Sequence, residues 1–505
     1  MVPSIADQLL RIAKGEVLSD DWSRKIYSVD ASHYCVKPSV IVCPLDEYDV
    51  SKVIQYAYSK ILSITARGAG TGLLGQSLND HVVFDFTKHM NKILEITDDY
   101  VLVQPGLVKG LLDKELLKKG KFLPPDPASS SYCTIGGMIA NNSSGIHALG
   151  YGSTIDFLDA VNVVYSDGRM GSISKMETNL FHAGFDDNKI SKLFKLISSQ
   201  MDLIENNFPK VSKNSCGYRL DALINNEEFF PQKIFAASEG TLGVVTSAKL
   251  KIMDVPLYNS TIVFGFENFL DAICAVPFIL KFSPVALELL DHTIFSNFDT
   301  ENYPIINNNL KGCLLFVKFS GDNLYIVEQK SSLCKNKLSS RSAVNLETVT
   351  DENSSAKIWQ ARKSALNNVM KLTVGSRKPI GLIEDTVVSP EWLYEYMRFV
   401  LQKYRDNKLN YVMYGHAGNG NLHTRPIIDT MSQGATELID NIAHDVFTKV
   451  IKFGGTITGE HGDGLSRTKY IEYMYGPRVS SVFQDVKKIF DPKYIMNPGK
   501  KVIER

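Results

Sequence analysis

The sequence predicts an α+β protein with at least two domains. The chain has 505 residues, more than one ordinary hydrophobic core accommodates. From about Pro38 to Asp254, short β-rich runs alternate with Gly-rich turns and helical patterns. After Pro256 the glycines become fewer, and amphipathic helix and strand patterns continue to about residue 410. This change in pattern favours a domain boundary near residue 255.

We divide the chain into three parts, with the first division at this boundary. We expect a first domain over 1–255 that includes an N-terminal amphipathic helix, a second domain over 256–455, and a final segment over 456–505 that returns to the first domain. In the first domain, 49–60 is predicted to be a helix, and 82–86 and 101–104 are predicted to be strands. In the second domain, Asn307 to Asn309 are expected in a loop.

The composition excludes several classes of protein. With 55 basic and 55 acidic residues, the chain has no net charge that would favour nucleic acid. No apolar run reaches the length of about 18 residues that a membrane span requires. The N-terminal segment lacks the features of a signal or transit peptide. The seven cysteines show no C-x-x-C spacing, which argues against both a disulfide framework and an iron–sulfur cluster. We therefore expect a cytoplasmic protein that does not span a membrane.

A glycine-rich loop occupies residues 67–72, with the sequence Arg-Gly-Ala-Gly-Thr-Gly. Small residues in a tight loop can present several backbone N–H groups to one anion, such as a pyrophosphate. The spacing differs from the G-x-G-x-x-G dinucleotide fingerprint, and a purely structural turn explains this loop equally well. Three further small-residue segments follow, at 134–145, 151–156 and 238–245. Together they favour backbone packed against a large ligand.

Two polar clusters lie near the C-terminal end. Residues 411–416 and 421–425 are predicted to be strands joined by the turn Gly418-Asn419-Gly420. This hairpin would bring His416 and His423 close enough to share one metal ion. Glu460 could complete the site. On spacing alone, a hydrogen-bonded histidine pair without metal remains the commoner explanation.

The ordered set of motifs resembles the vanillyl-alcohol-oxidase/PCMH-type FAD flavoproteins. Within that group, it is similar to the branch of D-lactate dehydrogenase, D-2-hydroxyglutarate dehydrogenase and the D subunit of glycolate oxidase. The resemblance runs from about Trp22 to Lys500. It implies a two-subdomain FAD-binding domain over 1–255, an α+β substrate (cap) domain over 256–455 that carries the hairpin, and a C-terminal segment that completes the active site.

The resemblance also implies which residues contact FAD. The loop from Arg67 to Gly75 would hold the pyrophosphate, and Thr71 stands where some relatives carry the histidine that binds flavin covalently, so non-covalent FAD is expected. The full set of implied FAD contacts is Pro44, Arg67, Gly68, Ala69, Gly70, Thr71, Gly72, Gly75, Gln76, Pro125, Thr134, Gly136, Gly137, Ala140, Asn142, Gly145, Tyr151, Glu239, Gly240, Gly243, Val245 and Asn497.

For the active site, the pattern G-H-x-G-x-G-N-L-H followed by G-E-H-G resembles the metal signature of the family. It implies that His416, His423 and Glu460 bind one divalent metal, with zinc favoured and manganese or iron also suited. His461 matches the catalytic histidine, and because adjacent side chains on an extended segment point opposite ways, it is expected to act as a base rather than a ligand. Arg362, on a predicted helix, matches the arginine that binds the substrate carboxylate.

Two further residues and one segment are considered for the active site. Arg377 and Asn421 are further candidates for substrate contact, although an exposed basic residue is the alternative reading at Arg377. The segment containing Glu384 is expected to be the edge of a strand with a structural role.

The implied reaction is oxidation of a D-2-hydroxy acid to the 2-oxo acid by hydride transfer to flavin N5. The sequence leaves D-lactate, D-2-hydroxyglutarate and glycolate open as substrates. The expected electron acceptor is separate from this chain: an iron–sulfur subunit, a soluble carrier or a quinone-linked partner, which could place the protein beside a membrane. A homo-oligomer is also open. Three alternatives stand beside this reading: an alcohol or sugar oxidase of the same fold, a metal-dependent hydrolase, and a flavin subunit that only relays electrons.

Overall fold

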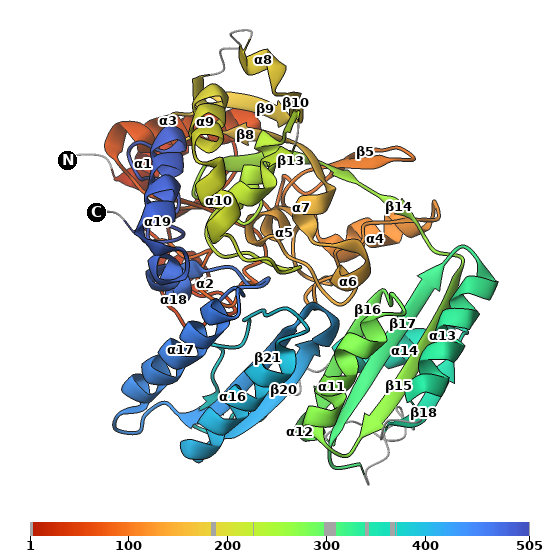
Figure 1. Ribbon diagram of the computed structural model, residues 1–505. Helices are drawn as coiled ribbons and strands as arrows, with labels where there is room; N and C mark the ends of the chain where they lie inside the picture. Colours follow the sequence, from red (N-terminus) through yellow and green to blue (C-terminus); the bar gives the residue numbers. More distant parts are fainter. Residues whose placement is uncertain are drawn as a thin grey trace.

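The protein consists of a first half with two main sheets and a second half built on one seven-stranded sheet (Figure 1). The computed structural model describes residues 4–182, 188–225, 227–296, 310–338, 343–363, 369 and 371–503. The loop expected at Asn307 to Asn309 lies outside these residues. Within the described ranges, no helix combines the length and apolar character that crossing a membrane requires. All seven cysteines are free thiols, as expected from their spacing.

The first subdomain is a four-stranded sheet in the order β1-β2-β4-β3. Strand β4 runs parallel to both β2 and β3, while β1 pairs antiparallel with β2. The helix predicted at 49–60 is present as α3, which buries Val50, Val53 and Ile54 against this sheet. The bounds are α1 Ile5–Ile12, β1 Glu16–Leu18, α2 Asp21–Ile26, β2 Val40–Cys43, α3 Glu47–Lys60, β3 Ile64–Arg67 and β4 Val82–Asp85.

The second subdomain is an antiparallel five-stranded sheet in the order β5-β6-β13-β8-β9. Its strands are β5 Ile93–Ile96, β6 Tyr100–Val103, β8 Leu158–Val164, β9 Met170–Ser174 and β13 Val244–Lys251. Its helices are α4 Lys109–Leu117, α5 Ile135–Asn141, α6 Ala148–Tyr151, α7 Thr154–Phe157, α8 Asn179–His182, α9 Asn188–Ser199 and α10 Met201–Asn207. Short pairings join β7 Lys121–Phe122 to β14 Met253–Asp254, and β12 Glu228–Phe229 to both β10 Met176–Glu177 and β11 Ile224–Asn225.

The second half is an antiparallel seven-stranded sheet in the order β18-β15-β17-β16-β20-β21-β19. Its strands are β15 Tyr258–Phe266, β16 Ala286–Asp291, β17 Cys313–Gly321, β18 Val344–Val349, β19 Arg377–Pro379, β20 Asn410–His416 and β21 Asn421–Asp429. Its helices are α11 Phe269–Leu280, α12 His292–Phe295, α13 Leu324–Leu338, α14 Glu352–Lys363 and α16 Leu393–Asp406. Strands β20 and β21 form the predicted hairpin, with Tyr414 opposite His423 and His416 opposite Asn421.

The C-terminal part runs from the large sheet back to the first half, where it is drawn in dark blue beside the N-terminal elements (Figure 1). It comprises α17 Ala435–Lys452, α18 Gly464–Arg467 and α19 Ile471–Phe490, which bends at Gly476. Beyond α19, the chain pairs with β3: the N–H of Ile64 donates to Ile495, and the N–H of Asn497 donates to Ile64. The α+β fold with a returning C-terminal segment is therefore confirmed.

Candidate active site

One cavity is lined by both halves of the protein. The first half contributes the loop 68–73 and residues of α5, including Gly137, Met138 and Ala140. The other half and the C-terminal segment contribute Arg362, Lys363, Tyr414, His416, His423, Glu460 and His461. A second cavity shares Gly68, Thr134, Gly137 and Ala140 with the first and extends past Phe86, Gly240, Gly243 and Val245. The two together make an elongated cleft that ends at the histidine cluster.

Most of the residues expected to contact FAD line this cleft, namely Arg67, Gly68, Ala69, Gly70, Thr71, Gly72, Gln76, Thr134, Gly136, Gly137, Ala140, Gly145, Glu239, Gly240, Gly243 and Val245. Six expected contacts do not line it: Pro44, Gly75, Pro125, Asn142, Tyr151 and Asn497. Tyr151 lines a neighbouring cavity and packs edge-on against Phe122. Asn497 supports the cleft from behind, because its amide donates to the carbonyls of Gln76 and Glu239.

Arg67 gives a direct test of whether this cleft suits FAD. Its Nη2 donates to the carbonyl of Val29 at 2.8 Å, but its Nη1 is buried and has no hydrogen-bond partner among the described residues. A buried, unpaired guanidinium N–H is costly unless a ligand satisfies it. Because Arg67 lines the cleft beside the glycine loop, an anionic group such as a pyrophosphate fits this position.

The histidine cluster converges on one oxygen of Glu460. The Nε2 atoms of His416 and His423 lie 2.9 and 3.4 Å from Glu460 Oε1. Both rings are buried, and their centroids are 5.4 Å apart. The two histidines are diagonal neighbours across the hairpin rather than directly opposite, because the turn places Asn421 opposite His416. His416, His423 and Glu460 are close enough to bind one metal ion together.

The second nitrogen of each imidazole is already occupied. His416 Nδ1 lies 2.8 Å from Glu288 Oε1, and His423 Nδ1 lies 3.2 Å from the backbone carbonyl of Glu384. Such partners fix the ring orientation and direct each Nε2 toward Glu460 Oε1. A divalent cation would replace the proton that His416 Nε2 donates to Glu460, and the two imidazoles and the carboxylate fit such an ion.

The other oxygen of Glu460 is held by two groups from the first half of the chain. The ammonium of Lys213 lies 3.0 Å from Glu460 Oε2, and the hydroxyl of Ser144 donates to the same atom at 2.5 Å. Burial alone raises the pKa of Glu460, but Lys213 and His416 outweigh this and hold the pKa well below its usual range. Glu460 is therefore ionised, with Oε1 turned toward the two histidines.

His461 faces the same cluster, contrary to the expectation that it would point away from Glu460. Its Nε2 lies 3.8 Å from Glu460 Oε1, and its ring stacks on His423 with centroids 5.0 Å apart. The reason is a tertiary contact: residues 459–461 form a bend rather than an extended strand, because the carboxylate of Asp385 accepts all three of their backbone N–H groups.

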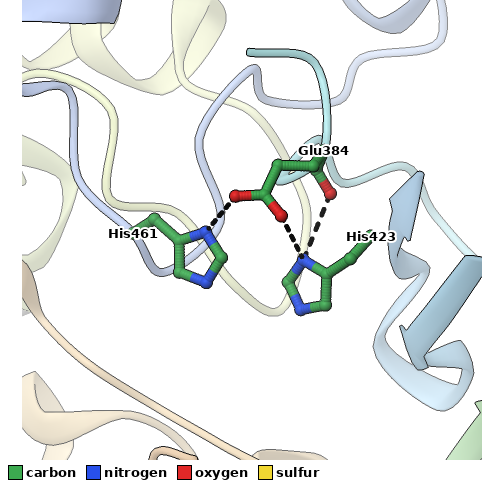
Figure 2. Close-up of side chains that lie close together, drawn as sticks. All are labelled: Glu384, His423 and His461. Atoms are coloured by element: carbon green, nitrogen blue, oxygen red, sulfur yellow. Dashed lines mark hydrogen bonds and ion pairs between the residues drawn. The ribbon is translucent and has the colours of Figure 1, made fainter. Parts of the chain in front are cut away.

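Glu384 bridges the Nδ1 atoms of the two stacked histidines, His423 and His461 (Figure 2). Its Oε1 accepts from His461 Nδ1 at 2.9 Å, and its Oε2 accepts from Arg425 Nε at 2.8 Å. The prediction that this segment is the edge of a strand was wrong, because residues 384 and 385 form a turn. Their buried carboxylates accept hydrogen bonds from His461 Nδ1 and from the backbone of the loop 459–461.

The acidic surroundings also affect the charge of His461. Burial alone lowers the pKa of its imidazole, but Asp385 and Glu384 outweigh that effect and raise the pKa to about 9. For His423 burial prevails and lowers the pKa. The protein by itself therefore stabilises a protonated His461, and a nearby divalent cation would oppose this charge and favour the neutral, basic imidazole.

Arg362 lies on α14, as predicted, and reaches the same cavity. It is 4% exposed, and its Nη2 donates to Glu288 Oε2 at 2.6 Å. Arg377 is exposed on the edge strand β19 and does not line the cavity. Asn421 is buried and does not line the cavity either. Its side-chain amide donates to Asp385 and to the backbone carbonyl of Thr386. The structure thus brings Arg362 to the cluster but brings neither Arg377 nor Asn421 into the cavity.

Sequence reasoning missed Lys213, Glu288, Asp385, Arg425 and Arg467, which surround the cluster. Each is buried. Glu288 stands in the otherwise apolar strand segment Ala286–Leu290, and a charged residue within an apolar run is the one local signal that could have singled it out.

Comparisons with known proteins agree with this architecture. The profile of FAD-binding domains matches residues 38–174, and the profile of the C-terminal domain of FAD-linked oxidases matches residues 255–501. Among solved structures, p-cresol methylhydroxylase with substrate bound aligns over 97% of this chain and 94% of its own, with a TM-score of 0.69 at 14% identity. An alkyldihydroxyacetonephosphate synthase aligns over 98% of this chain and 86% of its own, with a TM-score of 0.68 at 19% identity. The chain belongs to the FAD-linked oxidases of the p-cresol methylhydroxylase fold.

Three proteins related in sequence have higher identity to this chain than these two solved structures do. D-2-hydroxyglutarate dehydrogenase of Escherichia coli is 30% identical over 96% of this chain, which spans about half the length of that relative. Glycolate oxidase subunit GlcD of Bacillus subtilis is 29% identical over 98% of this chain and 96% of its own length. D-lactate dehydrogenase of Anaerostipes hadrus is 27% identical over 99% of this chain and 97% of its own length.

Proposed function

We propose that the protein oxidises a D-2-hydroxy acid to the 2-oxo acid, using non-covalently bound FAD and one divalent metal. The observation that carries this proposal is the shared cavity, in which the glycine loop of the FAD-binding half faces the cluster of two histidines and Glu460. The names of the sequence relatives support the substrate class, because all three act on D-2-hydroxy acids or glycolate. A buried arginine beside the cluster supports an anionic substrate.

Each side chain then has a defined task. Arg362 binds and orients the substrate carboxylate through guanidinium N–H groups. His416, His423 and Glu460 would hold the metal, which when bound supplies Lewis-acid stabilisation of the 2-hydroxyl as its proton leaves. His461 accepts that hydroxyl proton at Nε2, while Glu384 holds its Nδ1. Bound FAD supplies the acceptor for the hydride from C2, so that loss of one proton and one hydride gives the ketone.

After the substrate has been oxidised, the reduced flavin must pass its electrons to an acceptor. The chain shows no cysteine spacing typical of an iron–sulfur cluster, and all seven thiols are free. We propose that reduced flavin passes its electrons to an acceptor that lies outside residues 1–505. Rapid turnover with an artificial dye, slow reoxidation by oxygen and no reduction of NAD support this proposal, whereas oxygen turnover as fast as dye turnover contradicts it.

The main experiment is anaerobic bleaching of the flavin absorbance. Purified, zinc-loaded protein is mixed with D-lactate, L-lactate, D-2-hydroxyglutarate and glycolate in separate anaerobic cuvettes. Bleaching by one of these acids, with no bleaching by the L isomer of lactate, is the expected result. A protein that keeps its oxidised flavin spectrum with all of them, or that lacks flavin, is not this dehydrogenase. Flavin released by acid precipitation would support non-covalent binding at the loop containing Thr71.

A further inference from the structure

A single buried carboxylate, that of Glu288, contacts both a proposed metal ligand, His416, and the proposed substrate anchor, Arg362. Glu288 lies on β16, in the interior of the seven-stranded sheet, and is 1% exposed. Its Oε1 lies 2.8 Å from His416 Nδ1, and its Oε2 accepts from Arg362 Nη2 at 2.6 Å. No other described carboxylate contacts both groups within ion-pair distance. Burying a carboxylate is costly unless it is paired, and these two bonds pair both of its oxygens.

The bond to His416 determines which ring nitrogen carries a proton. An ionised carboxylate can only accept hydrogen bonds, so Nδ1 of His416 must be the donor. The proton is thereby kept on Nδ1. Glu460 Oε1 accepts from Nε2 at 2.9 Å by the same rule, so a metal ion at that position would replace the Nε2 proton and leave the Nδ1 proton on Glu288. A glutamine at residue 288 could donate its amide N–H to Nδ1 instead. That would favour the opposite tautomer, with a proton on the nitrogen that must bind the metal.

The bond to Arg362 fixes a planar cation at the cavity wall. Arg362 uses Nη2 for Glu288, while its Nε is buried and lacks any hydrogen-bond partner among the described residues. A buried, unsatisfied donor on a residue that lines the cavity is the feature expected of a group that awaits an anionic ligand. Glu288 therefore holds the guanidinium in place without satisfying all of its donors.

We propose that Glu288 is a positioning residue that orients His416 for the metal and Arg362 for the substrate carboxylate at the same time. This inference rests on the proposed function, because it assigns these two groups to metal and substrate. It predicts that one substitution weakens two affinities whose binding groups lie on different elements, α14 and β20. A merely structural carboxylate would affect folding stability without this paired effect.

The test compares Glu288→Gln with Asp291→Asn. Asp291 lies on the same strand, is 7% exposed, and binds Thr293 and the backbone N–H of Met413 instead of the site. Zinc affinity is measured by competition with a chromophoric chelator. Anion affinity is measured from the change that oxalate produces in the flavin spectrum. In Glu288→Gln, we expect zinc affinity to fall by about 10–100-fold and oxalate affinity by about tenfold, with both unchanged in Asp291→Asn.

Two outcomes overturn the inference: Glu288→Gln with wild-type affinity for both zinc and oxalate, or Asp291→Asn with equal losses. If Glu288→Gln does not fold, Glu288→Asp replaces it, since the shorter carboxylate cannot span both partners. At least one of the two affinities should then fall by about tenfold, and unchanged values overturn the inference equally. Failure of the proposed function is distinct, because wild-type protein would then bind neither zinc nor oxalate.

Discussion

The two ends of the active cleft are built in different ways. The FAD end consists mainly of backbone and small residues from continuous stretches, such as 68–72 and 134–140. The end proposed to bind the metal consists of charged side chains from segments far apart in the chain, including Lys213, Glu288, Glu384 and Glu460. A binding site formed by backbone groups depends on the local conformation of the chain. A binding site formed by side chains from distant segments depends on tertiary packing. The two ends should therefore respond differently to substitution.

The largest expected effect concerns the metal ligands. His423→Ala removes one of the three converging groups, so metal content and kcat/KM should fall together, the latter by about 10³-fold or more, because several kcal/mol of transition-state stabilisation are lost. FAD should remain bound, since the glycine loop is untouched. Metal analysis and flavin absorbance of the same sample measure both effects.

His444→Ala is the control for this substitution. Its side chain is 64% exposed on α17, away from the cavity. Unchanged metal stoichiometry in His423→Ala would remove this residue from the ligand set. Loss of FAD together with the metal would show that the two ends of the cleft are not independent.

His461→Ala tests the catalytic base. Loss of the proton acceptor should lower kcat by about 10²–10⁴-fold, while zinc and FAD are retained. Steady-state kinetics, together with zinc and flavin contents, distinguish this from loss of a ligand. A variant that loses zinc as completely as His423→Ala does would mean that His461 is a ligand, a role that its position 3.8 Å from Glu460 Oε1 makes geometrically accessible.

Arg362→Lys tests the substrate anchor at constant charge. An ammonium cannot reproduce the planar fork, and loss of a charged hydrogen bond costs about 1.5–3 kcal/mol. KM should rise by about 10–100-fold, with a smaller change in kcat. Lys363→Met provides the comparison, because Lys363 also lines the cavity but is directed toward Asp126 at 3.4 Å. A larger rise in KM for Lys363→Met than for Arg362→Lys would assign the carboxylate to Lys363.

The smallest expected effect concerns the FAD end. Gly70 has φ +68°, and a Cβ there would lie 2.5 Å from Arg67 Nη2. Gly70→Val should weaken FAD retention by about tenfold or more, because the added side chain would displace the Arg67 guanidinium and occupy space in the cleft, in addition to straining the left-handed backbone. Gel filtration followed by flavin absorbance measures the FAD that remains.

Gly454→Val is the matched control. Gly454 also has positive φ, +66°, but no described atom lies within 4 Å of the position of its Cβ. It should bear the same backbone strain and keep its flavin. Full FAD occupancy in Gly70→Val would mean that the loop tolerates a side chain and that the backbone account of this end is wrong.

The sequence by itself determined the elements whose signals are local. The period of apolar residues in α3, the β-branched and aromatic run of β4, the alternation in β6 and the turn that closes the β20–β21 hairpin all lie within short windows. The convergence of His416 and His423 follows from that hairpin. Glu460 was included in the predicted metal site because the surrounding G-E-H-G sequence resembles the family's metal motif. The glycine loops are local in the same sense, because a tight turn needs few long-range contacts.

Only the tertiary structure decided how the cluster is charged and oriented. Glu384 precedes the hairpin by 26 residues and Glu288 precedes it by 122, and nothing near them in sequence shows that Glu288 contacts His416 and Glu384 contacts His461. Asp385 turns the loop at 459–461 through its backbone N–H groups, which reverses the direction expected for His461. Ion pairs between distant residues leave no periodic pattern in the sequence, so their partners, and the pKa values that they set, become visible only when the chain is folded.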